Sequence, residues 1–399
     1  METIGTEMLN TEMLRMMRDP LGAPLHPTLV QILLVATFVL HIFFVTLALG
    51  AASFALWAFL RGSEWQKRLA RVAARIAPNA VGLGVVTGIA PLLFVQTIYD
   101  PLWYAANTLT GFWSTLFIFV VMGGYSMAYL FYLKGSAEGK LLWASALSVA
   151  LLLLAGWIMH VLASTQLYPE YWREWYAPNL EPDTRGIIFH AYNLPRVTFL
   201  LLVSSILSLG VTLMLFAWYF RQREDADVEY LTQVGNLGKR LALLAAPLLW
   251  ITGLAWAFTQ GIQFGLHIIM AMAFTFMALL IREGFRNLDP LTGGVRALGF
   301  WLLSLLGIGV IREVIRATSV ARYGYRVADY PFVWDWASVI IFALTSIVGV
   351  AVIAYLVLVL YDSGKGEVRP WVEKLGSVSI GMLGAWLALF ILLGIRLYL

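Results

Sequence analysis

The chain has 399 residues, of which 60% are hydrophobic and only 13% are charged, whereas soluble domains carry about 25% charged residues. This composition excludes an ordinary soluble domain, and the formal charge of +4 does not indicate nucleic-acid binding, because the basic residues fall mainly in short loops. The chain has no cysteine, which excludes disulfides, iron–sulfur ligation and covalent c-type heme attachment.

The sequence predicts an all-α, polytopic membrane bundle of nine or ten transmembrane helices. Residues 1–28 are polar and lack the basic-then-apolar order of a signal peptide, so we expect an exposed segment. Residues 29–399 contain no internal repeat and are expected to form one transmembrane domain, because about 20 apolar residues suffice to cross a bilayer. The expected spans are Leu29–Leu60, Ile76–Tyr99, Ala106–Leu133, Leu141–Ala163, Arg185–Phe220, Leu241–Phe258, Ile262–Ile281, Val295–Thr318, Trp334–Tyr361 and Leu375–Leu399.

Basic residues gather in the loops after the first, third, fifth and ninth spans. The positive-inside rule places these loops in the cytoplasm, so both chain ends are expected outside. Arg312, Arg316, Arg322 and Arg326 disobey this rule, because they fall at the outer end of the eighth span or in the loop after it. Either the propionates of a heme or an acidic protein partner would explain four arginines there.

The five histidines are the candidate cofactor ligands. His41 lies deep in the first span, where an imidazole is costly to bury unless it is paired or bound. Two interpretations stay open for it: a hydrogen bond to a neighbouring helix, or axial ligation of a heme iron. His26, His160, His190 and His267 all fall at or near the outer ends of spans. This distribution suggests redox centres in the outer half of the membrane.

Four segments, in order along the chain, resemble subunit I of the cytochrome bd-type quinol oxidases. Residues 41–50, His-Ile-Phe-Phe-Val-Thr-Leu-Ala-Leu-Gly, are similar to the family's first-helix motif around its buried heme-ligand histidine. Residues 82–88, Gly-Leu-Gly-Val-Val-Thr-Gly, are similar to its Gly-Val-Ala-Thr-Gly segment. The other two segments are Gly156-Trp157 and, at residues 187–190, Ile-Ile-Phe-His.

The resemblance implies a set of heme ligands. In the family, the histidine that His190 matches ligates a low-spin heme b beside the quinol site, and Met270 or the nearby His267 would supply its second ligand. His41 would hold a deeper heme, with His160 as the candidate second ligand. We therefore expect at least two hemes b at different depths, with iron ligands among His41, His190, Met270 and His267.

Two charged residues in the outer half of the spans have open roles. Arg196 is expected to bind a heme propionate or to form a salt bridge with Glu313 or Asp183, because an intramembrane arginine is usually paired. Glu313 is expected either to belong to an internal ion pair or to take up and release protons near a quinone.

The chain departs from the family in its third span. Thr110 stands where the family has the first of two acidic residues that serve oxygen reduction, and no acid follows it in the span. The family's long outer loop is missing, and Val368–Trp371 matches its Gly-Arg-Gln-Pro-Trp motif only in part. A hydroxyl group cannot relay protons or balance a ferric heme as a carboxylate does, so oxygen reduction is not expected.

The residues and the resemblance together predict a heme b electron-transfer subunit of a respiratory complex in a prokaryotic inner membrane, which exchanges electrons with quinone or quinol. Because this chain has no cysteine, a c-type cytochrome or iron–sulfur protein that exchanges electrons with it must be a separate chain, and a second membrane subunit is also expected. Two alternatives stay open: a terminal quinol:oxygen oxidoreductase of the bd type, and a heme-free structural or transport subunit.

Overall fold

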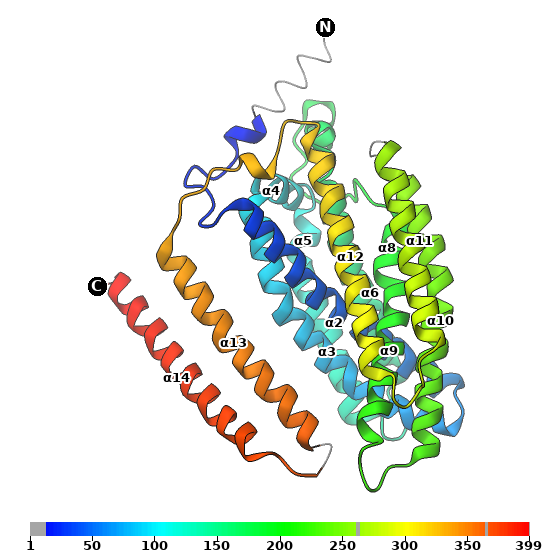
Figure 1. Ribbon diagram of the computed structural model, residues 1–399. Coiled ribbons are helices and arrows are strands. Elements are labelled where there is room, and N and C mark those ends of the chain that lie inside the picture. The colour runs from blue at the N-terminus through cyan, green and yellow to red at the C-terminus, as the bar shows by residue number, and fades with distance from the viewer. Residues whose placement is uncertain (1–12, 261–263, 364–365, 399) are drawn as a thin grey trace.

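The computed structural model describes residues 13–260, 264–363 and 366–398. Within these ranges the chain has no β-strand and has ten helices long and apolar enough to cross a membrane, which confirms the predicted polytopic bundle (Figure 1). The fifth span is composite, because α8, a π-helical stretch and α9 follow one another without a break. The spans are α2 (Pro27–Arg61), α3 (Glu64–Ile98), α5 (Gly111–Leu130) with a π-helical turn (Phe131–Gly135), α6 (Leu142–Thr165), α8 (Leu194–Val197) with Thr198–Val203 and α9 (Ser204–Phe220), α10 (Val228–Thr259), α11 (Phe264–Arg286), α12 (Gly294–Ala321), α13 (Trp336–Ser363) and α14 (Pro370–Tyr398).

The second and sixth spans begin earlier than hydropathy predicts. They start at Glu64 and Val228, not at Ile76 and Leu241. Their first turns both contain leucine, lysine, arginine and glutamine, which form helix readily, and their charged and polar residues make these turns too polar to score as membrane-embedded. The predicted start of the seventh span, Ile262, lies outside the described residues.

The fifth span is shorter than predicted at its N-terminal end. It starts at Leu194 and not at Arg185. Asn193 caps the helix with its side chain, and Pro195 occupies the first turn, where a missing N–H costs nothing. His190 therefore lies in the loop before the span and not on the helix.

The third predicted span is broken at Thr110. A short helix, α4 (Asp100–Leu109), ends there, and α5 begins one residue later. The expected start at Ala106 thus falls inside α4, which precedes the spanning helix. The hydroxyl of Thr110 donates to the carbonyl of Ala106 at 2.7 Å, so its polar group is satisfied within the helix junction.

Small residues allow the first two spans to pack closely. Each has 35 residues and is therefore about 52 Å long, so it must tilt or project beyond an apolar layer of about 30 Å. Pro27 opens α2, and Ser63 caps α3 through a capping box with Gln66. Close packing of small side chains is a general means of joining helices in lipid. The buried alanines of this contact are Ala51, Ala52, Ala55 and Ala58 of α2 and Ala70, Ala73, Ala74 and Ala77 of α3.

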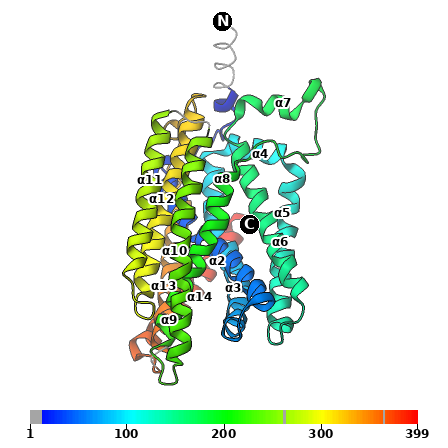
Figure 2. The ribbon, with the colours of Figure 1, turned by 90° about the vertical axis from the view of Figure 1, so that its right-hand side faces the viewer.

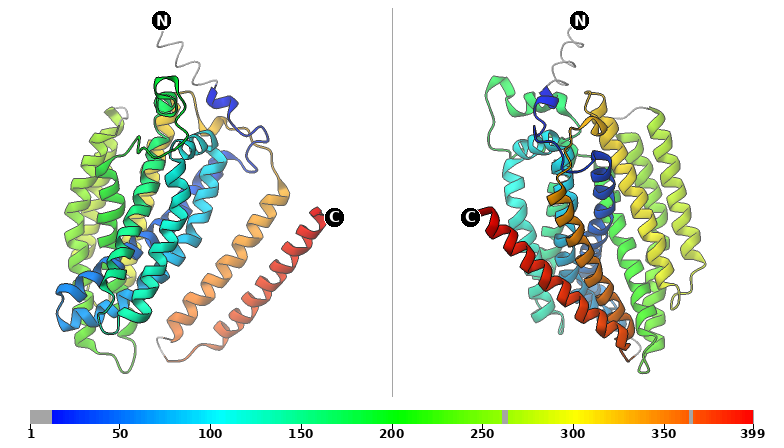
Figure 3. Two further views of the ribbon diagram at one scale, coloured as in Figure 1. Left: turned by 180° about the vertical axis from the view of Figure 1, so that it is seen from behind. Right: turned by 60° about the vertical axis from the view of Figure 1, so that its left-hand side comes forward.

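The most buried span is the fifth, which packs against α2, α10 and α12. Its backbone approaches α10 very closely, since a Cβ on Gly210 would lie 2.7 Å from the carbonyl oxygen of Gly238. Only glycine fits there. Helices α13 and α14 pair with each other and lie to one side of the other spans, as Figures 1 and 3 show from opposite directions. The functional residues discussed below belong to the larger group, α2 to α12.

We call the end of the bundle that carries residues 13–26, α4 and the loops 166–193 and 322–335 the upper end (Figures 1 and 2). Within it, Arg18 stacks on Tyr325 at 4.1 Å and donates to the backbone carbonyl of Asp329 at 2.9 Å. Leu14 and Ala23 are buried against the bundle. Residues 1–12 of the predicted N-terminal segment lie outside the described residues.

Candidate functional site

His41 lies 14 residues after Pro27, about 21 Å along α2. Its Nδ1 is 2.8 Å from the carbonyl oxygen of Gly84 on α3. A carbonyl can only accept, so Nδ1 carries the proton and Nε2 carries the lone pair. Among the described residues Nε2 has no hydrogen-bond partner. The histidine thus joins two helices and also presents the nitrogen that a heme iron would need.

His160 has a different arrangement. It is buried near the end of α6, and its Nε2 accepts a hydrogen bond from the backbone N–H of Asn193 at 2.9 Å. The side chain of Asn193 accepts from the N–H of Arg196 and donates to Thr259 Oγ1 at 3.0 Å. His160 therefore fixes the start of the fifth span against α6 and α10. Its Nε2 lone pair is engaged in this hydrogen bond.

His190 lies in the loop that precedes the fifth span and is half-buried. Its ring stacks on Trp175 with a centroid distance of 5.0 Å and an interplanar angle of 17°. Burial lowers the pKa of His190, while the nearby carboxylate of Asp183 opposes that shift. Hydrogen bonds from Arg185 lower the pKa of Asp183 itself to about 2, so this acid stays ionised beside the histidine.

His267 and Met270 lie on α11. The Nδ1 of His267 is hydrogen-bonded to the carbonyl oxygen of Ala257 on α10, and its ring stacks on Phe258. Met270 is only 2% exposed and belongs to the main core cluster together with Trp256. In the described part of the chain, neither residue shares a hydrogen bond, ring contact or core cluster with His190. The pairing of His190 with Met270 or His267 around one heme therefore stays a prediction.

Three arginines converge from two helices in the upper half of the bundle: Arg196 of α8, and Arg312 and Arg316 of α12. Arg196 is 6% exposed; its Nη1 donates to Ser164 Oγ at 3.3 Å, and its Nε has no partner. The guanidinium of Arg312 lies 4.2 Å from the ring centroid of Phe38. The three groups lie close enough to repel one another electrostatically. We call these three residues the arginine cluster.

One carboxylate accompanies the arginine cluster. Glu313 pairs with Arg316 at 3.2 Å, both groups being buried. Its other oxygen, Oε1, accepts from the hydroxyl of Tyr99 at 2.6 Å and from Gln31 Nε2 at 2.8 Å. Glu313 therefore forms the internal ion pair expected as one of its two roles. The formal charge of the cluster together with this acid is +2.

The structure gives Arg196 neither of the acidic partners that the sequence suggested. Glu313 pairs with Arg316, and Asp183 pairs with Arg185 at 2.9 Å in the exposed loop. Among the described residues Arg196 forms no salt bridge. A guanidinium buried with an unsatisfied Nε inside a membrane bundle is costly, which makes this position a candidate site for a bound anion.

The two remaining outer arginines lie in the loop after α12. Arg322 pairs with Glu170 at 3.2 Å and is held within the upper loops. Arg326 is exposed. The group of four arginines read from the sequence therefore divides into buried Arg316, half-buried Arg312 and two exposed loop residues.

Asp100, at the start of α4, was missed by sequence reasoning. Its Oδ2 accepts from the N–H of Asp19 at 2.8 Å and from the hydroxyl of Tyr330 at 2.9 Å, whereas its buried Oδ1 has no partner. Burial raises the pKa of Asp100. Gln31 was missed as well. Each was visible as a polar residue at the edge of an apolar run, but its partners come from segments far away in the sequence.

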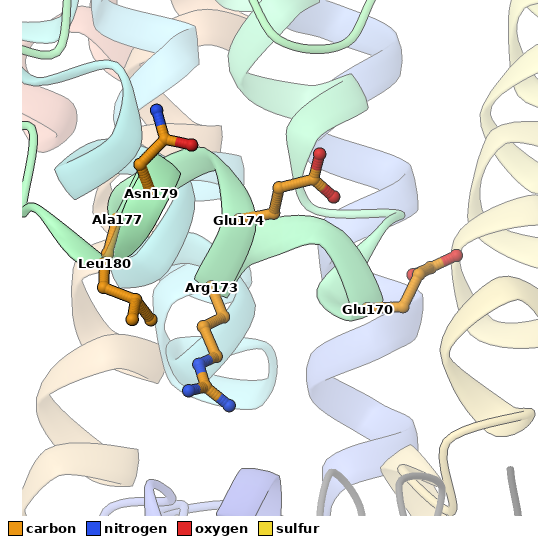
Figure 4. A pocket seen from close by; sticks show the side chains of 6 residues that line it. All are labelled: Glu170, Arg173, Glu174, Ala177, Asn179 and Leu180. Carbon is orange, nitrogen blue, oxygen red and sulfur yellow. The ribbon is translucent and has the colours of Figure 1, made fainter. Parts of the chain in front are cut away.

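Two of the cavities in the described chain touch neither the histidines nor the arginine cluster. A surface depression of about 310 Å³ lies beside α7 (Trp172–Tyr176) in the upper loop, where Figure 4 shows its side chains. A void of about 10 Å³ lies between α2, α3, α5 and α6, where Phe131 and several small residues line it. The depression is lined by Glu170, Arg173, Glu174, Ala177, Asn179 and Leu180.

The chain is similar in fold to a chain of a solved bd oxidase. The structure of bd oxidase from Geobacillus thermodenitrificans contains a chain that superposes with a TM-score of 0.55 over 91% of this chain and 99% of its own length, at 13% identity. No protein-family model and no curated protein matches the sequence. At this identity the likeness establishes a bd oxidase-like membrane fold, which agrees with the resemblance seen in the sequence.

Proposed function

We propose that this chain is a membrane-embedded heme b electron-transfer subunit of a respiratory complex, exchanging electrons with quinone or quinol and with a partner redox protein. The fold similar to a bd oxidase supports the class of protein. The observation that supports a bound heme is the arginine cluster, in which Arg196 is buried with an unpartnered Nε.

The charge of the residues present matches the charge of the propionates of one heme. Three guanidiniums and the carboxylate of Glu313 leave +2, and the two propionates of one heme supply −2, so the group would neutralise this region. Arginine is well suited to binding propionates, since the planar donors of its guanidinium match the geometry of a carboxylate. Here Arg196, Arg312 and Arg316 would hold and orient the propionates and keep water from them.

The histidines supply the candidate iron ligands. His41 fits best, because its Nδ1 is fixed by Gly84 and its Nε2 carries a lone pair. His267 has the same arrangement on α11. Together with His190 and Met270 they make up the proposed ligand set, with at least two hemes, while the engaged Nε2 of His160 leaves that residue a positioning role. A bound heme would supply one-electron transfer.

The proposal assigns oxygen reduction to no residue of this chain. At the third span Thr110 offers a hydroxyl that is already bonded to a backbone carbonyl, and its neighbour Ser114 adds only another hydroxyl. Electrons would pass to or from a c-type cytochrome or an iron–sulfur protein. The complex would also contain a second membrane subunit. We place the complex in a prokaryotic inner membrane, with both ends of this chain outside.

The test is the colour and electron chemistry of the purified protein, produced with ample heme supply. We expect reduced-minus-oxidised bands of heme b, reduction of that heme by quinol, and negligible oxygen uptake by this chain. A colourless protein would refute the heme and would favour the structural or transport alternative. Rapid quinol-driven oxygen uptake would favour a bd-type oxidase.

A further inference from the structure

We propose that an anionic phospholipid binds by its phosphate at the lower end of the bundle, in a site formed by Arg71 and Arg75 of α3 and Tyr230 of α10. The lower end lies opposite the upper loops and carries the turn between α2 and α3 and the loop before α10 (Figure 1). The positive-inside rule predicts that this end faces the cytoplasm. None of these residues is a candidate heme ligand, so the site does not depend on the proposed function.

Tyr230 supplies the buried part of the site. Its side chain is only 8% exposed and belongs to a core cluster with small residues of α2 and α3, yet its buried hydroxyl has no hydrogen-bond partner in the described chain. The guanidinium of Arg68 lies 3.9 Å from the centroid of the Tyr230 ring, and Arg71 is close enough to act electrostatically on the phenol. A buried donor without an acceptor costs stability, and an anionic oxygen between these cations would satisfy it.

The arginines of α3 are only partly neutralised by nearby acids. Arg68 pairs with Asp227 at 2.6 Å, and Glu64 pairs at 2.9 Å with the lysine one turn along α3. Both acids are therefore engaged, whereas Arg71 and Arg75 are exposed and form no ion pair with any residue that the structure describes. Residues four apart on a helix are neighbours, so one phosphate can contact both guanidiniums.

The same face of α3 continues as an apolar stripe, which favours a phospholipid over free phosphate. Val86, Ile89 and Leu93 fall within about 40° of Arg75 around the helix axis and are 67%, 54% and 54% exposed. Arg75 and Val86 are about 16 Å apart along the helix, and half of the apolar layer is about 15 Å thick. An acyl chain that starts at a head group on Arg75 therefore reaches the stripe. The two unpaired cations select an anionic head group over a zwitterionic one.

The experiment measures the unfolding temperature of the purified protein in nonionic detergent micelles that contain phosphatidylglycerol, phosphatidylcholine or neither, and with inorganic phosphate alone. The apparent affinity follows from the dependence of that temperature on lipid concentration. We expect phosphatidylglycerol to raise the unfolding temperature, and phosphatidylcholine and inorganic phosphate to leave it unchanged. An equal rise with phosphatidylcholine, or a rise with inorganic phosphate alone, would overturn the proposal.

Tyr230→Phe distinguishes a defined site from general attraction to a basic surface. Without lipid the variant should be at least as stable as the wild-type protein, because it loses a buried donor that has no acceptor. Its affinity for phosphatidylglycerol should fall about tenfold or more, since a hydrogen bond to a charged group is lost.

Arg71→Gln should weaken the affinity about fivefold, which corresponds to the loss of one cation beside an anionic lipid. Arg296→Gln is the matched control, because it removes an exposed arginine from the start of α12 at the same end of the bundle and should bind like the wild-type protein. Wild-type affinity in Tyr230→Phe, or equal losses in Arg71→Gln and Arg296→Gln, would show attraction to the basic end as a whole and would overturn the proposed site.

Discussion

Replacing Gly88 by alanine tests how His41 is held between α2 and α3. A Cβ at this position would lie 2.8 Å from both Nδ1 and Cε1 of the His41 ring, whereas comfortable contact needs about 3.5 Å. The ring must therefore move by roughly 0.7 Å, and a shift of that size weakens the 2.8 Å hydrogen bond to Gly84. Overpacking of this kind costs about 1–3 kcal/mol, offset in part by the roughly 1 kcal/mol that alanine gains over glycine in a helix.

The assay is thermal unfolding in detergent together with the absorption spectrum of the heme-loaded protein. We expect Gly88→Ala to unfold at a lower temperature and to show displaced heme bands. Gly381→Ala is the matched control, since it adds the same methyl group to a spanning helix with no other heavy atom within 4 Å. The reasoning would be refuted if the two variants had the same stability and the same spectrum.

Three further predictions concern individual side chains. His41→Ala and His190→Ala should each remove one heme and leave the other, because His41 lies deep on α2 and His190 lies in the upper loop. Heme extraction from each variant checks this, and loss of both hemes or of neither from a folded variant would contradict it. His160→Ala should lower the unfolding temperature, since it leaves the N–H of Asn193 unpaired at a cost of about 1–3 kcal/mol, without changing the heme spectrum; an altered spectrum would make His160 a ligand. Burial raises the pKa of Asp100, so its favourable contribution to stability is present at low pH and is lost as pH rises through that pKa. Asp100→Asn should flatten this dependence in melting curves recorded from pH 4 to pH 8, and unchanged curves would argue against the burial effect.

The spans were predictable because a bilayer imposes a simple rule on sequence. Ten apolar runs gave ten helices, and even the short sixth and seventh spans are present in the described chain. Hydropathy could not predict the residues at which the helices begin and end. The start at Glu64 depends on helix propensity, and the start at Leu194 depends on the cap at Asn193. These are local interactions that contribute little to an average over about 20 residues.

The candidate site was predictable only in its separate parts. Arg312 and Arg316 stood out because they violate the charge rule, and Arg196 stood out because it lies inside a span. That these three meet depends on how the fifth span packs beside α12, which no local pattern contains. The same holds for His160, whose partner at residue 193 follows a loop that the sequence had assigned to a helix.

The claim that the positive charge of the arginine cluster binds heme can be tested with Arg196→Met, which keeps an unbranched side chain and removes the cation. The measurement is the unfolding temperature of wild-type and variant proteins, each without heme and with saturating heme. Without heme the variant should be the more stable, because it no longer buries a charge with an unsatisfied donor. Heme should raise the unfolding temperature of the wild-type protein more than that of the variant. Stabilisation by a ligand increases with its affinity, and the variant has lost a propionate partner. If Arg196→Met instead destabilised the heme-free protein and heme stabilised both proteins equally, the claim that this cluster binds the heme would be contradicted.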